Sequence, residues 1–221
     1  MTTDPEPEVA VKTPGDMARH IARVAARLFA SQGYDATSVR TIVEAAGVTK
    51  PTLYYHFGSK EGLAQALLTD PMTAFVATLQ ACLGSTDDPV ANLAAQVEVH
   101  FQFMRDDPDR GRFFYALFFG PLSTSLSSEL AGFGRQIGEA MRAGVARVVE
   151  AGIVDPARAG AFETACRGTV VVHTMDFLYE KPVCHDRPPA EYGPVLALSI
   201  VTDLIRGFGV APTSALSSRS F

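Results

Sequence analysis

The chain has 221 residues, 47% of them hydrophobic and 19% charged, and this composition excludes intrinsic disorder for most of its length. Its three cysteines, Cys82, Cys166 and Cys184, form no C-x-x-C pair, which argues against a disulfide framework or a closed zinc site and favours a reducing cytoplasm. The first residues are acidic and proline-rich, and no run approaches the ~20 apolar residues that span a bilayer, so we expect neither export nor membrane insertion.

Charge is distributed unevenly along the chain, although the formal net charge is −5. Residues 1–10 hold three acids and no base, residues 11–68 hold seven bases against four acids, and residues 69–221 hold twelve bases against seventeen acids. A small basic segment therefore precedes a larger acidic one, which suggests a polyanionic partner for the front of the chain only. A small excess of bases is also compatible with chance variation of charge along the chain. Whether the bases cluster around one structural element therefore decides between chance and a polyanion-binding segment.

Residues 16–33 are predicted to form an amphipathic helix. Asp16 is placed to cap its start and Gly33 to end it. Its apolar residues recur at the spacing of one helix face, at Ile21, Val24, Ala25, Leu28 and Phe29. This face needs a partner, and the next two segments supply one.

Two shorter helices are predicted at 39–46 and 50–57, joined by Gly47, Val48 and Thr49. The glycine suits a left-handed backbone position after the first of them, the valine fills the core between them, and the threonine caps the second. Helices this short bury their apolar faces only if the turn brings them together under the preceding helix. This is the helix-turn-helix layout.

The rest of the chain is predicted to be helical as well, which makes the fold all-α. Four Asp-Pro pairs, at 70–71, 88–89, 107–108 and 155–156, each suit an N-cap followed by the first helical position. The expected helices cover 60–69 and 71–83 (one helix kinked at Pro71, or two), 89–105, 108–119, 127–150, 156–180 and 194–208. Residues 181–194 form a Pro-rich loop and residues 209–221 a Ser-rich tail.

Residues 37–63, T-S-V-R-T-I-V-E-A-A-G-V-T-K-P-T-L-Y-Y-H-F-G-S-K-E-G-L, resemble the tetracycline-repressor (TetR) family of bacterial transcriptional regulators. The resemblance begins in the first helix and covers about 48 residues. It implies a disordered arm at 1–14, a DNA-binding domain at 15–62, an effector-binding and dimerisation domain of helical-bundle type at 63–209 and a flexible tail at 210–221. Pro51 stands where the family often has glycine, and Pro71 falls in the helix that links the two domains, so we expect a bend there.

Sequence is read in the major groove by side chains near the N-terminus of one helix, while neighbouring groups contact phosphates. Lys50 and Thr52 are the candidates for contacts at or near base edges, and Thr49 for a phosphate contact. Tyr54 or Tyr55 can place a hydroxyl on a phosphate or a ring on a thymine methyl group. We expect one of the two tyrosines to be buried in the core.

Further candidates for backbone contacts lie around the same helix. The resemblance implies that His56 touches the DNA backbone. Lys60 begins the next helix, where free amides suit an anion, and Thr37 and Ser38 stand in the same position before the second helix. Arg40 is a further candidate. For Thr37 a purely structural capping role is a strong alternative.

The acidic part of the chain concentrates aromatic residues and methionines that could line a cavity for a small hydrophobic or aromatic effector. The candidate residues are His100, Phe103, Met104, Phe114, Phe118, Met141, His173 and Phe177. For any one of the aromatics, an ordinary core position is the more frequent alternative. The two histidines lack a third ligand at metal spacing, so no metal and no cofactor is expected.

The helices at 156–180 and 194–208 are apolar on more than one side, which predicts a homodimer interface in addition to the internal core. A dimer is also expected because one short recognition helix reads too little DNA, so the target is a pseudo-palindromic double-stranded operator. The resulting prediction is a cytoplasmic repressor that a small effector releases from DNA. Three alternatives remain: an activator, a helical interaction module that binds no DNA, and an enzyme, for which no G-x-S-x-G, H-E-x-x-H or phosphate-loop motif is present.

Overall fold

The computed structural model describes residues 14–120, 126–179 and 191–209. In these ranges the chain forms nine α-helices, two short 3-10 helices and no strand, with one isolated bridge between Val154 and Gly209. The predicted all-α fold is confirmed. The N-terminal arm, most of the Pro-rich segment and the C-terminal tail lie outside the described residues.

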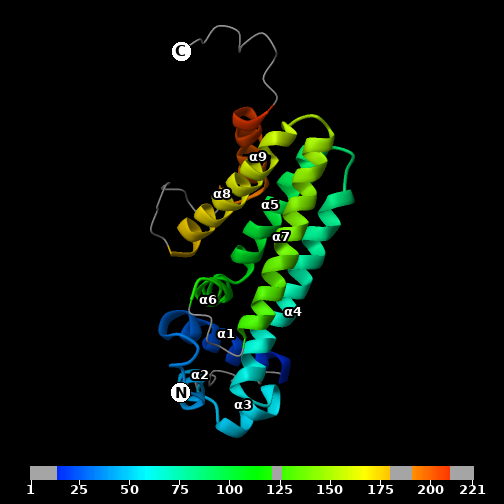
Figure 1. Cartoon of the computed structure of the whole chain (residues 1–221). Helices are drawn as coiled ribbons and strands as arrows, with labels where there is room; N and C mark the ends of the chain where they lie inside the picture. The colour runs from blue at the N-terminus through cyan, green and yellow to red at the C-terminus, as the bar shows by residue number, and fades with distance from the viewer. Residues whose placement is uncertain (1–13, 121–125, 180–190, 210–221) are drawn as a thin grey trace, which may run out of the picture.

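Three helices form a compact unit at one end of the molecule, which we call the head (Figure 1). They are α1 (Pro14–Gln32), α2 (Val39–Ala46) and α3 (Lys50–Phe57). The predicted apolar face of α1 is buried, with Ile21, Ala25 and Phe29 fully inaccessible to solvent. The three helices of the head and the turn between α2 and α3 therefore occur where the sequence predicts them.

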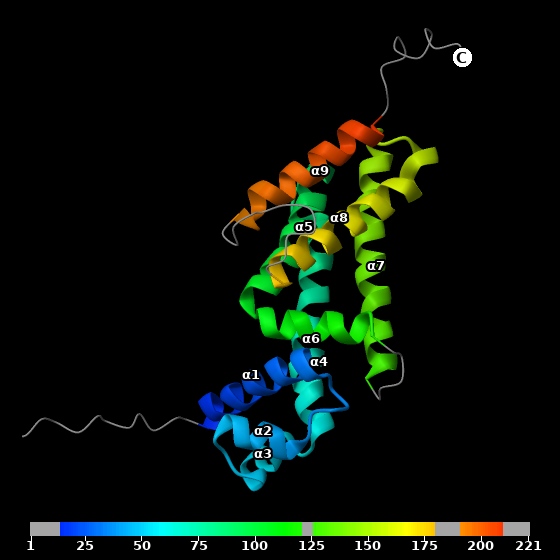
Figure 2. The same ribbon diagram turned by 90° about the vertical axis from the view of Figure 1, so that its left-hand side faces the viewer.

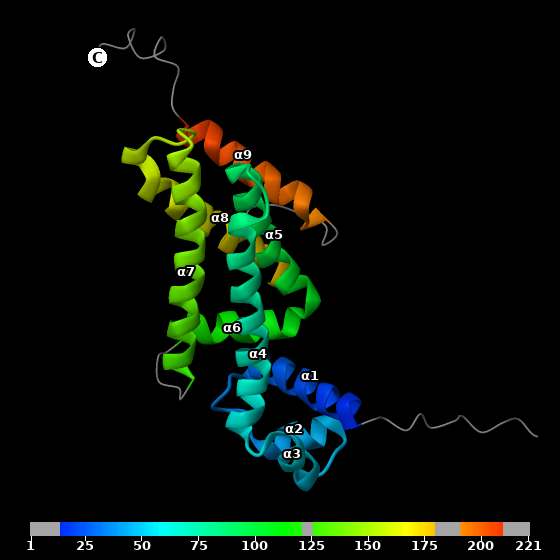
Figure 3. The ribbon, with the colours of Figure 1, turned by 90° about the vertical axis from the view of Figure 1, so that its right-hand side faces the viewer.

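The remaining helices form an elongated bundle, which we call the body (Figures 1 and 3). They are α4 (Lys60–Ala81), η1 (Cys82–Gly84), α5 (Pro89–Asp106), α6 (Pro108–Phe118), α7 (Ser127–Glu150), η2 (Pro156–Arg158), α8 (Ala159–Tyr179) and α9 (Pro194–Phe208). Asp88, Asp107 and Asp155 each accept hydrogen bonds from the following backbone amides, as predicted for N-caps.

Helix α4 connects head and body and continues without interruption through Pro71. The sequence leaves open whether this region is one helix or two, and the structure has one. Proline has no N–H, so the carbonyl of Leu67 lacks its donor one turn later, which weakens the helix at this point. Leu63 and Leu67, before the proline, pack with the head, whereas Met72 and Phe75, after it, face the body.

The stretch Lys60–Gly84 corrects one expectation. It contains an 18-residue window with a mean hydropathy of 1.3 and is therefore long and apolar enough to cross a membrane by length and composition. Eight of its apolar side chains are buried inside the protein, and a helix at the centre of a protein core meets the same criteria. The apolar character of α4 is thus accounted for by its packing against α1, α5 and α7.

The hydrophobic core consists of two clusters that do not follow the domain boundary expected at residue 62. The first cluster runs continuously from Ile21 and Leu53 in the head to Phe103 and Phe113 in the lower body. The second lies between α5, α7, α8 and α9 in the upper body. Helix α6 crosses the molecule directly above α1 (Figure 2). The head is therefore packed into the body and not attached through a linker.

Candidate nucleic-acid interface and effector cavity

The turn between α2 and α3 is built from local hydrogen bonds. Ser38 caps α2 by accepting from Thr41 N at 3.1 Å, and Thr49 caps α3 by accepting from Thr52 N at 3.3 Å. Gly47 adopts the left-handed conformation, with φ 64° and ψ 33°, that ends α2 and that a side chain disfavours. These contacts hold α3 at a defined angle beneath α2.

Helix α3 presents one polar and aromatic face to solvent. Leu53 is completely buried, whereas Lys50, Tyr54 and Tyr55 are exposed. The expectation that one of the two tyrosines is buried in the core is wrong: 46% of Tyr54 and 82% of Tyr55 is exposed. A large aromatic ring this exposed, in an edge-to-face contact with the His56 ring, is suited to contact a partner.

The other candidate residues around α3 differ in their solvent exposure and in their hydrogen-bond partners. Ser38 and Thr49 are exposed but already bonded to backbone amides, and Thr52 and His56 are half-buried. Arg40 is exposed and its Nε lies 2.7 Å from Glu44 Oε1, which raises the pKa of the guanidinium. Because both partners are exposed, this pair is weak enough to be exchanged for a phosphate.

Thr37 and Lys60 both have partners inside the protein, which favours a structural role over a DNA contact for each. Thr37 is completely buried and its hydroxyl donates to Gly33 O at 2.7 Å, because the loop after α1 folds over it. The Lys60 ammonium donates to Tyr34 O at 3.0 Å and Thr37 O at 3.1 Å and lies over the Tyr34 ring. Lys60 thus fixes this loop to α4, and its charge is directed into the protein.

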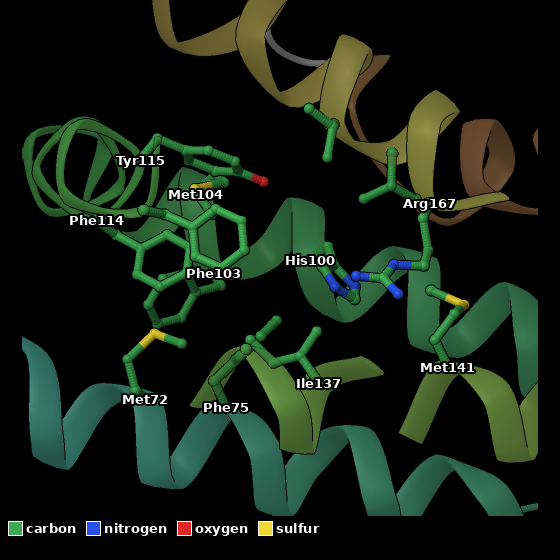
Figure 4. A pocket seen from close by; sticks show the side chains of 14 residues that line it. Met72, Phe75, His100, Phe103, Met104, Phe114, Tyr115, Ile137, Met141 and Arg167 are labelled. Atoms are coloured by element: carbon green, nitrogen blue, oxygen red, sulfur yellow. The ribbon is translucent and has the colours of Figure 1, made fainter. Parts of the chain in front are cut away.

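A cavity of about 80 Å³ lies in the body, where the two core clusters meet (Figure 4). Helices α4, α5, α6, α7 and α8 all contribute to its wall. The lining residues are Met72, Phe75, His100, Phe103, Met104, Phe114, Tyr115, Phe118, Gly134, Ile137, Met141, Arg167, Val170 and Val171. Sulfur and aromatic groups dominate, and such side chains adapt their shape to a bound ligand.

Six of the eight residues predicted for the effector pocket line this cavity. His173 and Phe177 do not. Both pack around Tyr192 instead, with ring centroids 6.3 Å and 5.3 Å from it. Helical spacing alone does not distinguish the two sides of α8, because both are apolar.

The polar groups at the cavity are few. His100 Nδ1 donates to Gln96 O at 2.8 Å, and burial together with the nearby Arg167 charge lowers the pKa of His100 to about 4. The ring is therefore neutral at physiological pH. Burial raises the pKa of Tyr115 to about 12, so its hydroxyl also stays protonated. Arg167 is the only charged side chain among the described residues of the lining.

Sequence reasoning missed several lining residues, and some of them carry a signal. Met72 and Phe75 are spaced for one face of the helix after Pro71, and Arg167 is an isolated base in the otherwise uncharged stretch 164–175. In the residues that the structure describes, no group of three or more His, Cys, Asp or Glu could hold a metal ion. Cys82 and Cys166 are buried free thiols, and burial raises the pKa of Cys166 to about 12.

The fold and these two sites define a class: a helix-turn-helix DNA-binding protein whose helical body contains an internal cavity. Residues 21–67 match the family model described as bacterial regulatory proteins, tetR family. Over these residues the chain is similar to this family of transcriptional regulators, as its sequence suggests, and the relatives it matches are regulators and not enzymes. The match falls on the head and the first part of α4.

Curated relatives are similar over the same region. The transcriptional activator FasR of Mycolicibacterium smegmatis is 37% identical over 83 residues, which is 38% of each chain. The transcriptional repressor KstR2 of Mycobacterium tuberculosis is 33% identical over 82 residues, 37% of this chain and 41% of the relative. The chain therefore spans about two-fifths of the length of these relatives.

Two solved structures extend the likeness to the body. KstR2 of Mycobacterium tuberculosis, described as a ketosteroid transcriptional regulator, superposes with a TM-score of 0.72 at 20% identity, covering 88% of this chain and 95% of that one. AibR, in complex with isovaleryl coenzyme A and operator DNA, superposes with a TM-score of 0.62 at 19% identity, covering 87% and 97%. At these identities the likeness in the body is one of fold.

Proposed function

We propose that this chain is a homodimeric, cytoplasmic transcriptional repressor that binds a pseudo-palindromic operator and is released from it by a small hydrophobic effector. The observation that carries the DNA-binding part is the face of α3: Thr49 caps the helix and Leu53 anchors it, so that Lys50 and Tyr55 extend into solvent. A helix anchored on one side and exposed on the other is suited to enter a major groove.

The exposed groups suggest which residues contact bases of the operator and which contact its phosphates. Lys50 at the start of α3 is placed for a base edge or an adjacent phosphate, and Tyr54 and Tyr55 for a phosphate or a thymine methyl group. Arg40 would exchange Glu44 for a phosphate. We leave Lys60 out of this set because its ammonium donates to two carbonyl groups of the protein.

Salt-dependent DNA binding tests this assignment. Fluorescence anisotropy with the DNA upstream of its own gene and of the divergent neighbour measures affinity from low to physiological salt. Lys50→Gln should weaken binding and reduce the salt slope by about two, since each subunit of the dimer releases one fewer counterion. Lys60→Gln is the matched control and should leave the slope unchanged. Equal slopes for wild type and Lys50→Gln, or operator affinity that is insensitive to salt, would contradict the proposal.

The dimer is supported by the outer faces of α8 and α9. Leu196, Ala197, Ile200 and Val201 of α9 pack in the protein's own core, but Val195 on the opposite side is 83% exposed and Leu198 is 48% exposed. The outer face of α8 carries small residues, including Gly160, Ala161, Thr164 and Gly168, which permit close approach of another helix. Exposed apolar groups beside small residues suit a two-fold four-helix contact. Leu198→Asp should shift the mass measured by light scattering to that of a monomer.

The cavity is connected to the head through α6. Phe113 packs on Phe29 of α1 with ring centroids 4.9 Å apart, while the next residue, Phe114, lines the cavity. A displacement of α6 by an effector would therefore reach α1 directly. At about 80 Å³ the cavity is smaller than most ligands, so binding requires it to widen, which couples occupancy to the arrangement of helices.

The chemistry of the lining and the relatives agree on an effector with an apolar part. AibR binds isovaleryl coenzyme A, and KstR2 is described as a ketosteroid regulator. Calorimetry on protein stripped of co-purified ligand tests the prediction with apolar and aromatic candidates. Effector binding should weaken operator affinity by the same factor as operator binding weakens effector affinity. Transcription in vitro from the bound promoter distinguishes a repressor from an activator such as FasR.

A further inference from the structure

The one charged group among the described residues of the effector cavity lies beside a neutral histidine. Arg167 extends from α8 toward the cavity, and its guanidinium lies beside the His100 ring from α5 (Figure 4). The opposite part of the lining is formed by apolar side chains of α4 and α6, including Met72, Phe75 and Phe114. The cavity is therefore amphipathic, with a single cation at its polar end among the described lining residues.

The histidine does not compensate this cation. Its Nδ1 donates to Gln96 O at 2.8 Å, so the proton of the neutral ring is on Nδ1 and Nε2 holds a lone pair. A neutral imidazole carries no charge, so it neither neutralises the guanidinium nor adds a second positive charge beside it. On the cavity side, the charge of Arg167 is therefore not balanced by His100.

The carboxylate partner of Arg167 is only a partial one. Glu163 Oε1 lies 3.7 Å from Arg167 Nη1, which is beyond hydrogen-bond distance, and Glu163 Oε2 lies 3.5 Å from Arg142 Nε. One carboxylate is therefore shared between two guanidinium groups. The planar fork of Arg167 retains donors that an anion could take up in bidentate geometry.

Phe118 and Arg167 both lie beside α7 at the cavity mouth. A Cβ at Gly134 would lie 3.0 Å from the Phe118 ring, closer than side chains usually approach, whereas one at Gly138 would lie 3.5 Å from Arg167 Nη1, an ordinary contact distance. The absence of a side chain at Gly134 therefore makes room for Phe118. Phe118 is 39% exposed and the Arg167 side chain 48% exposed, so both reach from the cavity to solvent.

We propose that the effector is an anionic amphiphile whose apolar part enters the methionine- and phenylalanine-lined cavity while Arg167 binds its anionic group at the mouth. This inference rests on the proposed function and adds the charge of the ligand to it. The anion is either the carboxylate of an apolar acid or a phosphate of a carrier to which such an acid is joined. In both cases Arg167 is the specificity-determining residue.

Calorimetry with three probes of equal chain length tests the inference on the stripped, full-length protein. Octanoate carries a carboxylate, octanoyl coenzyme A carries phosphates, and octanamide is neutral. We expect either octanoate or octanoyl coenzyme A to bind at least about tenfold more tightly than octanamide, a ratio typical of one charge-assisted hydrogen-bonded pair. Which of the two anions is preferred identifies the source of the charge.

The matched variants are Arg167→Gln and Arg142→Gln, because both arginines contact Glu163 but only Arg167 lines the cavity. The preference for the anion should disappear in Arg167→Gln and persist in Arg142→Gln, with octanamide affinity similar in both. The inference is overturned if octanamide binds as tightly as both anions, if no probe binds, or if the two variants behave alike. Octanamide that binds and releases DNA without any charge preference would refute the inference and leave the proposed function standing, whereas absence of operator binding would refute the proposed function.

Discussion

The head and the cavity region of this protein are stabilised in different ways. In the head, short helices are fixed by caps at Ser38 and Thr49, by the left-handed Gly47 and by fully buried side chains such as Leu53. Around the cavity, flexible methionines and aromatic rings from five helices meet without filling the space between them. The head therefore presents a fixed surface, whereas the cavity can change its shape. This difference suits a protein in which one region binds DNA and the other adapts to a ligand.

The two regions nevertheless share one hydrophobic cluster. Met72, Phe75 and Phe114 belong both to the cavity lining and to the cluster that contains the core of the head. Two packed cores in contact do not deform independently, because interiors are close-packed. A ligand that widens the cavity thus acts on a core that also supports α1 and α3. The following predictions test how far the difference between the two regions extends.

The largest effect is expected from removing a phenylalanine of the closed core. Phe29 is completely buried between Tyr34 and Phe113, so Phe29→Ala should lower the free energy of unfolding by about 3–5 kcal/mol. Phe114→Ala should cost less, by at least about 1 kcal/mol, because one side of that ring already faces a void. Urea denaturation at fixed protein concentration measures both. Equal losses would mean that the cavity wall is packed as tightly as the head.

The next effect concerns the buried neutral histidine of the cavity. The pKa of His100 is about 4 in the folded protein, below its ordinary 6.5, so between pH 7 and pH 5 the unfolded chain takes up a proton that the folded protein does not. Stability should therefore fall by about 2 kcal/mol over this interval through His100 alone. The fall should be smaller by that amount in His100→Gln, measured by urea denaturation at both pH values. An identical pH dependence in the variant would show that the ring is not held neutral.

A smaller effect separates Lys50, the first residue of α3, from Lys60, the first residue of α4. Lys60→Met leaves the carbonyl groups of Tyr34 and Thr37 without their donor and should lower the free energy of unfolding by about 1–2 kcal/mol. Lys50→Met should leave stability unchanged, because Lys50 is exposed, and should affect DNA binding alone. Thermal unfolding of both variants, with the operator affinity of each, gives the comparison. Loss of stability in Lys50→Met would indicate that α3 is supported through this side chain.

The smallest effect on stability is expected at the junction of the two regions. Pro71→Ala restores the helical hydrogen bond that proline omits and should change the response to effector more than the affinity for operator. We expect the effector concentration for half-release from DNA to shift on the order of fivefold, the lower end of typical couplings between sites. Anisotropy titrations with and without effector measure both quantities. Equal shifts in the two would show that Pro71 is not the point at which the helix bends.

Much of the head follows from local sequence. Ser38, Thr49 and Gly47 act through hydrogen bonds and backbone conformations within a few residues, so their roles could be predicted from spacing alone. The same holds for the Asp-Pro caps before α5, α6 and η2, and for the buried face of α1. These elements depend on neighbours along the chain, which the sequence displays directly.

The misassigned residues are those whose partners are distant in sequence. Lys60 was expected on DNA but bonds to carbonyls 23 and 26 residues away, and Thr37 is enclosed by the loop that this lysine holds. His173 and Phe177 pack on Tyr192 and not on the cavity, which Arg167 of the same helix lines. The packing of five helices determines which residues of a largely apolar helix line a cavity. The spacing of apolar residues within that helix does not contain this information.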